Sequence, residues 1–75
     1  MRLAFDRQSW VEIRDRDGRR IFSKLNPAGS TQTVSGMPPF TLVVGNAAGV
    51  RITYHDKPVD LAPHIDVDVA RLTLE

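Results

Sequence analysis

The stretch SWVEIRDRDGRRIFSKL, residues 9–25, contains two runs of alternating apolar and polar residues on either side of an Asp-rich turn. Alternation of this kind is typical of strands that bury one face. Asp15 suits the first position of a type I turn, and Gly18 suits the left-handed position that closes a three-residue hairpin loop. We therefore predict antiparallel strands at residues 9–14 and 20–25, joined by this loop.

The three-residue loop also predicts the register of the hairpin. It pairs Ile13 with Ile21 and Val11 with Ser23. A two-residue loop would shift the register by one and place Lys24 among the apolar residues. We prefer the first register because it keeps one face free of charge. The two faces of the hairpin then carry, on one side, Val11, Ile13, Ile21 and Leu25, and on the other, Trp10, Glu12, Phe22 and Lys24.

The composition of the rest of the chain favours strands as well. Val, Ile and Thr total 17 residues, whereas Glu, Lys and Gln total only 6. Stiff β-branched side chains suit a pleated surface, and Gly and Pro punctuate the chain at short intervals. We predict an all-β fold, a small immunoglobulin-like β-sandwich of six or seven short antiparallel strands. The strands would come from eight candidate segments, residues 2–6, 9–14, 20–25, 31–35, 40–44, 50–55, 59–61 and 67–74.

Three of these segments carry further expectations. The polar strand at residues 31–35 is expected at a sheet edge. In the strand at residues 40–44, Val43 breaks the alternation, which predicts that both of its faces are covered. The glycine-rich segment from Gly45 to Gly49 is expected to form a hairpin turn, with Asn46 tolerating a left-handed conformation.

The length, net charge and cysteine content of the chain limit the number of domains and the kinds of partner and chemistry to be expected. Seventy-five residues suffice for one domain, so we take 1–75 as a single β domain. With 10 basic and 9 acidic residues the net charge is +1, which argues against duplex nucleic acid or an anionic membrane as a dominant partner. The chain has no cysteine, which excludes disulfides and a cysteine nucleophile. Met1 and the closing residues 74–75 are of a kind that a cloning vector can contribute, which suggests a fragment of a longer protein.

No motif in the sequence predicts an active site, a metal site or a cofactor site. His55 and His64 lack further ligands at metal-binding spacing, and Asp15 to Gly18 lacks the later oxygen ligands of a calcium loop. The segment from Gly45 to Gly49 precedes a β pattern rather than a helix, unlike a phosphate-binding loop. Ser35 lacks the glycine frame of a nucleophile elbow. We therefore predict a protein that is not an enzyme and needs no cofactor.

The predicted outer face of the first hairpin is the strongest candidate for binding. Trp10 and Phe22 would lie diagonally on it, beside Lys24, and aromatic residues with charged neighbours are typical of protein interfaces. We favour the interpretation in which another strand or the proline loop covers Trp10, because a chain with few large residues rarely leaves its only Trp exposed. In the alternative of a glycan ligand, an envelope glycan could stack on Trp10 or on Tyr54. The candidate partner-binding residues are Trp10, Phe22, Lys24 and Tyr54.

A basic cluster, Arg14, Arg16, Arg19 and Arg20, leaves single-strand nucleic-acid binding as a weaker alternative. Asp15 and Asp17 lie between these arginines in the sequence and offset part of their charge. Proteins that bind single-stranded nucleic acid combine a basic groove with several aromatic side chains on which bases stack. The chain has five aromatics in all. We therefore expect this domain to bind no nucleic acid.

The order of short motifs along the chain resembles one family. These motifs are SWVEI at residues 9–13, DRDG at 15–18, GMPPF at 36–40, GNA at 45–47, PVDL at 58–61 and VARLTL at 69–74. Together they resemble the C-terminal domain of RodZ-like bacterial cell-shape proteins, from Leu3 to Leu74. The chain departs from the family at His55-Asp56-Lys57, where an Asn/Gly-type turn is more usual.

The resemblance implies a larger parent protein, anchored in the inner membrane by one helix. In such proteins a cytoplasmic helix-turn-helix domain contacts the actin-like filament, and the β domain lies in the periplasm. The resemblance therefore implies a non-catalytic interaction module that links the cytoskeleton to envelope synthesis, with envelope or elongation-machinery proteins as partners. An envelope glycan is the alternative ligand. Nothing in the sequence predicts the oligomeric state.

Overall fold

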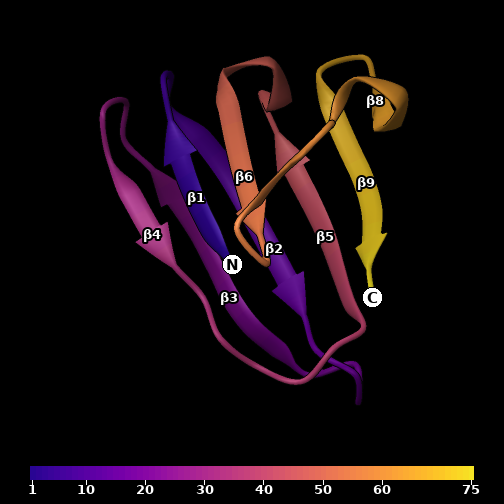
Figure 1. Cartoon of the computed structure of the whole chain (residues 1–75). Helices are drawn as coiled ribbons and strands as arrows, with labels where there is room; N and C mark the ends of the chain where they lie inside the picture. The colour runs from indigo at the N-terminus through magenta and orange to yellow at the C-terminus, as the bar shows by residue number, and fades with distance from the viewer.

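The computed structural model covers residues 1–75 and forms a β-sandwich of two antiparallel sheets, as the alternating sequence predicts. The smaller sheet has the strand order β4-β1-β6-β7, and the larger has the order β3-β2-β5-β9-β8 (Figure 1). The strands are β1 (Arg2–Phe5), β2 (Ser9–Arg14), β3 (Arg20–Asn26), β4 (Thr31–Thr33), β5 (Phe40–Gly45), β6 (Val50–Tyr54), β7 (Lys57–Val59), β8 (Ile65–Asp66) and β9 (Val69–Leu74). Two short 3-10 helices, η1 (Ala47–Gly49) and η2 (Ala62–His64), complete the chain, and neither has the length or apolarity to cross a membrane.

The core lies between the two sheets and is built from their inward-facing residues. Leu3, Phe5 and Ile52 from the smaller sheet meet Ile13 and Leu42 from the larger, and all five are 2% exposed or less. Burying such a side chain contributes about 1.5–3 kcal/mol relative to leaving it in water. The pairing of the strands places these residues on one face of each sheet, which is why the alternation in the sequence indicates the fold.

The structure has nine strands rather than the expected six or seven. Eight of the nine correspond to the eight candidate segments, including the three-residue strands β4 and β7, and the two-residue strand β8 is the one without a candidate segment. Residues 63–66 lie outside the candidate strands, but Ile65 and Asp66 pair with Ala70 and Val69 and form β8. The seventh expected strand, residues 59–61, lies two residues earlier, because Pro58 pairs with Thr53 at the sheet edge.

Two expectations, one about the faces of β5 and one about the segment that follows it, are wrong. Gly45 to Gly49 does not form a hairpin, since β5 and β6 belong to different sheets and η1 carries the chain between them. Asn46 does adopt the left-handed conformation, with φ of 57°. Strand β5 is covered on only one face, because Thr41 is exposed and Val43 is half-buried. The expected edge position of β4 is confirmed.

The first hairpin has a different register from the predicted one. Its loop forms as expected: Asp15 accepts bonds at Oδ1 from the amides of Asp17 and Arg19, and Gly18 has φ of 77°. The predicted register holds next to the loop, where Arg14 pairs with Arg20. A bulge then shifts the pairing by one residue. From there to the end of β3, the strands follow the register that the sequence argument rejected, with Val11 opposite Lys24.

The bulge has a physical cause in the sequence Ile21-Phe22. A regular strand would send one of these two apolar neighbours to the solvent. The extra residue at the bulge lets both Ile21 and Phe22 pack against the core. The consequence is that Lys24 lies on the inner side of the sheet, opposite Val11. Lys24 stays exposed because β3 is an edge strand, and an inward charge at an edge discourages pairing with a further strand.

Two of the hairpins close with residues that are unusual in tight turns. His55 and Asp56 join β6 to β7 with φ of 53° and 61°, and Val67 and Asp68 join β8 to β9 with φ of 48° and 66°. Two successive positive φ angles are the requirement of a type I′ turn. At this turn, where the sequence resemblance implied Asn/Gly-type residues, His55 and Asp56 form a two-residue connection between Tyr54 and Lys57.

Candidate interaction face

The outer face of the five-stranded sheet is open to solvent and carries the only tryptophan. Cross-strand pairing places Leu25, Trp10, Gly45 and Val69 in one continuous row across β3, β2, β5 and β9. Trp10 is 40% exposed and Leu25 is 54% exposed. The interpretation in which another segment covers Trp10 is therefore wrong. We call this row the Trp10 row.

Gly45 leaves one flank of Trp10 without a neighbouring side chain. A Cβ atom placed on Gly45 would lie 3.7 Å from the carbonyl oxygen and 3.8 Å from the Cβ of Trp10, which is ordinary contact distance. The position is therefore unfilled rather than blocked. An incoming apolar group could approach the base of the Trp10 side chain there, between β2 and β9.

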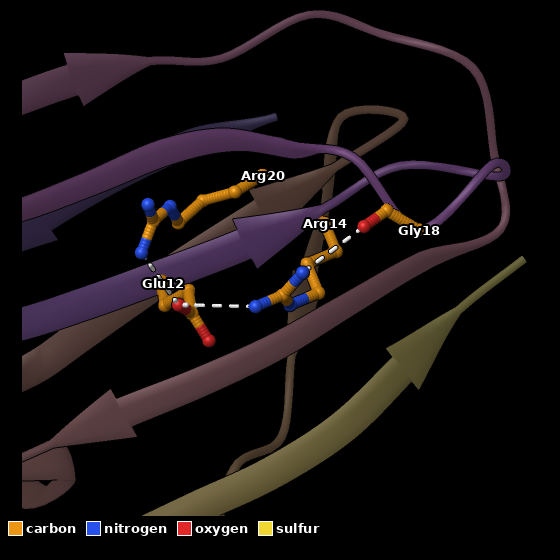
Figure 2. Close-up of polar contacts among 4 residues, drawn as sticks. All are labelled: Glu12, Arg14, Gly18 and Arg20. Atoms are coloured by element: carbon orange, nitrogen blue, oxygen red, sulfur yellow. Dashed lines mark hydrogen bonds and ion pairs between the residues drawn. The ribbon is translucent and has the colours of Figure 1, made fainter.

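A charged cluster lies next to the Trp10 row on the same face. Glu12 is 3.7 Å from a guanidinium nitrogen of Arg14 and 3.7 Å from one of Arg20, and its side chain is only 18% exposed (Figure 2). Arg14 also donates a hydrogen bond of 3.0 Å to the carbonyl oxygen of Gly18. The cluster therefore holds two arginines around one carboxylate and leaves a net positive charge beside the apolar row.

The second row of the face adds another arginine. Glu12 pairs with Val43, and Val43 pairs with Arg71 on β9. Adjacent strands lie about 4.8 Å apart, so Arg71 is roughly 10 Å from Glu12 along the row. The face as a whole combines an apolar row with three arginines and one glutamate. That combination is typical of protein interfaces, which are enriched in aromatic residues and arginine.

Of the four sequence-predicted binding residues, only Trp10 lies on this face. The shifted register turns Phe22 toward the core, opposite Ile13, and puts Lys24 on the inner side at the sheet edge. Leu25, which the predicted register placed with the apolar set, pairs with Trp10 on the outside. The sequence argument also missed Gly45, Val69 and Arg71, because their proximity to Trp10 comes from pairing between distant strands.

Tyr54 belongs to the other sheet and does not meet Trp10. Its ring packs edge-on against Phe40, with centroids 5.9 Å apart, and lies 4.0 Å from the His55 ring. Its hydroxyl is buried without a hydrogen-bond partner. Tyr54 is therefore partly buried and packs against the core. His55 lies in the β6–β7 turn and His64 in η2, and no group of three or more His, Cys, Asp or Glu side chains gathers anywhere in the fold.

Comparison with protein-family models identifies the family of the chain. The model of the RodZ C-terminal domain matches residues 2–73. The chain belongs to this family. The match spans both sheets of the sandwich, from the first residue of β1 to the penultimate residue of β9, and it confirms the family resemblance of the sequence motifs. No solved structure matches the chain. Membership in the RodZ C-terminal domain family supports a cell-shape-related interaction module over an enzyme.

Proposed function

We propose that this RodZ C-terminal domain is the interaction module of a membrane-anchored cell-shape protein that links the actin-like cytoskeleton to envelope synthesis. The Trp10 row is the proposed contact surface for a partner from the elongation machinery. The observation that carries this proposal is the exposure of Trp10 and Leu25 on an uncovered sheet face. Large exposed apolar side chains in one row mark contact sites more often than isolated ones do.

The energetic argument rests on the aromatic anchor. Truncation of a central Trp at a protein interface commonly costs about 2 kcal/mol or more of binding free energy, which is a roughly thirtyfold loss of affinity. Leu25 and the unfilled position at Gly45 flank Trp10 on its two neighbouring strands. The arginines beside Glu12 would guide the approach of an acidic partner surface, because complementary charge raises the association rate.

The test uses the parent protein in the organism that encodes it. Trp10→Ala combined with Leu25→Ser should abolish normal cell shape while the isolated domain keeps a dispersed amide spectrum. The control is Lys57→Ala at an exposed position on β7 of the other sheet, which should leave cell shape normal. Normal shape in the double variant, at normal protein level, would rule out the Trp10 row as the contact surface.

We further propose that the domain lies in the periplasm, an expectation that rests on the family resemblance. The absence of cysteine makes this directly measurable. A single cysteine introduced at the exposed loop residue Asp17 should react with a membrane-impermeant maleimide in intact cells. Labelling only after the inner membrane is permeabilised would place the domain in the cytoplasm.

A further inference from the structure

The smaller sheet, opposite the sheet that carries the Trp10 row, has a hollow lined by residues of its outer face together with Val50, Ile52, Val59 and Leu61, which belong to the core or pack against it. Its volume is about 730 Å³, which is within the range of sites for ligands of drug size. The residues that line it are Arg2, Ala4, Thr31, Thr33, Val50, Arg51, Ile52, Thr53, Pro58, Val59 and Leu61. None of these residues is acidic.

The strand pairing arranges the polar residues of this hollow as a small grid. One row, across β4, β1 and β6, is Thr33, Arg2 and Thr53; the next row is Thr31, Ala4 and Arg51. Five of these six side chains can donate hydrogen bonds. The sixth, Ala4, is the smallest, and it forms the floor of the hollow between its larger neighbours.

The two arginines lie at diagonal positions on adjacent strands. Such positions are about 7–8 Å apart, a distance that long side chains bridge easily. In the structure the Arg51 guanidinium bonds to Asp6, which follows the opposite end of β1 from Arg2, so both arginines would reach one oxyanion above Ala4 only when Arg51 exchanges Asp6 for it. A guanidinium presents paired N–H groups that match the two oxygens of a carboxylate. The geometry of the grid thus favours a carboxylate as the anionic group.

Of the two arginines, only Arg51 has an acidic partner. Asp6 accepts a hydrogen bond of 2.9 Å from Arg51, and both side chains are largely exposed. Exposed pairs of this kind contribute little and exchange readily, so Arg51 stays available to a ligand. Asp56 lies beyond Arg2 in an adjoining hollow and forms no ion pair with it.

We propose that this hollow binds an acidic saccharide, a sugar of one or two rings that carries a carboxylate. The carboxylate would lie between Arg2 and Arg51. Threonine hydroxyls both donate and accept hydrogen bonds, so Thr31, Thr33 and Thr53 suit the hydroxyl groups of a sugar. Ala4 and Pro58 offer apolar contact to the carbon face of the ring. The site shares no residue with the Trp10 row, so it does not depend on the proposed function.

The test is a titration of the isotopically labelled chain with digalacturonate, followed by amide chemical shifts at low ionic strength. Shifts should cluster on β1, β4 and β6. Arg51→Gln and Arg2→Gln should each weaken binding about tenfold or more, as expected for loss of a charged hydrogen bond. Ala4→Leu should also block binding, because it fills the floor while both arginines remain. Arg71→Gln, the matched loss of charge on the other sheet, should leave the affinity within about twofold.

Four outcomes would overturn the proposal. The first is the absence of localised shifts at millimolar digalacturonate. The second is an equal response to a neutral disaccharide, since the carboxylate would then be irrelevant. The third is that inorganic phosphate gives the same shifts with the same affinity, which would indicate a general anion site. The fourth is tighter binding of a tri-glutamate peptide at the same amides, which would identify an acidic protein segment as the ligand.

Discussion

Replacing Val67 by Asn should stabilise the domain, even though Val67 makes almost no contacts that could be improved. Val67 is 87% exposed and has φ of 48° at the first central position of the β8–β9 turn. For an L-residue the left-handed region costs roughly 1–2 kcal/mol, because Cβ crowds the following carbonyl oxygen. β-branched residues are genuine outliers there, whereas Asn is several-fold enriched.

The expected gain can be worked from these quantities. Because Val67 buries little surface, its removal loses little hydrophobic stabilisation, and most of the strain released appears as stability. We expect Val67→Asn to raise the free energy of unfolding by about 1 kcal/mol. For a domain of this size that corresponds to a rise in Tm of roughly 4–8 °C. Adding Asp68→Gly completes the Asn-Gly pair preferred in type I′ turns and should add to the gain.

Thermal and urea unfolding, monitored by circular dichroism, measure the effect. Val67→Thr is the matched control, because it adds polarity and keeps the β-branch, and it should leave Tm unchanged. His55→Asn in the β6–β7 turn should gain less, because His tolerates positive φ better and its ring packs at a tilt against the Tyr54 ring, with centroids 4.0 Å apart. Equal stabilisation by Val67→Thr, or no gain from Val67→Asn, would refute strain at this turn as the cause.

Three further predictions follow from burial. Leu42→Ala, at a fully buried position in the central strand β5, should cost about 2–5 kcal/mol and unfold a large fraction of the protein, as urea titration would show. Asn26→Ala should cost about 1–3 kcal/mol, because Nδ2 of the buried Asn26 donates to the carbonyl oxygens of Ser9 and Lys24; a shifted urea midpoint measures it. Trp10 should fluoresce at long wavelength and be quenched by acrylamide, and a shielded, blue-shifted emission would contradict its exposure.

The fold class and most strand positions were predictable because they depend on local alternation. Strand β2 begins and ends where the pattern predicts, and β1, β5 and β6 differ from the prediction by one residue at one end. Each of these strands alternates buried and less buried residues along its length. The very short strand β8 could not be predicted, since two residues carry no periodicity and its pairing depends on the β9 strand that follows.

The candidate site was harder to predict because it depends on register and on long-range pairing. The predicted register kept the faces of the hairpin clean, but it left Phe22 in solvent. The protein instead buries both Ile21 and Phe22 through a bulge and leaves Lys24 at the inner edge, where the amine reaches water. Burying a further aromatic ring outweighs an inward lysine that remains solvated. The alternation of apolar and polar residues alone does not show whether burial of Phe22 or outward placement of Lys24 decides the register.

The same logic explains why the hollow on the smaller sheet has no sequence signature. Arg2 and Arg51 are 49 positions apart, and they lie near each other only because β1 pairs with β6. Each arginine alone is an ordinary solvated residue on a strand. Their shared position above Ala4, on the face opposite the Trp10 row, means that two binding surfaces of different chemistry could be occupied at once. Variants on one sheet should therefore leave binding at the other unchanged, because sites this far apart without shared partners behave additively.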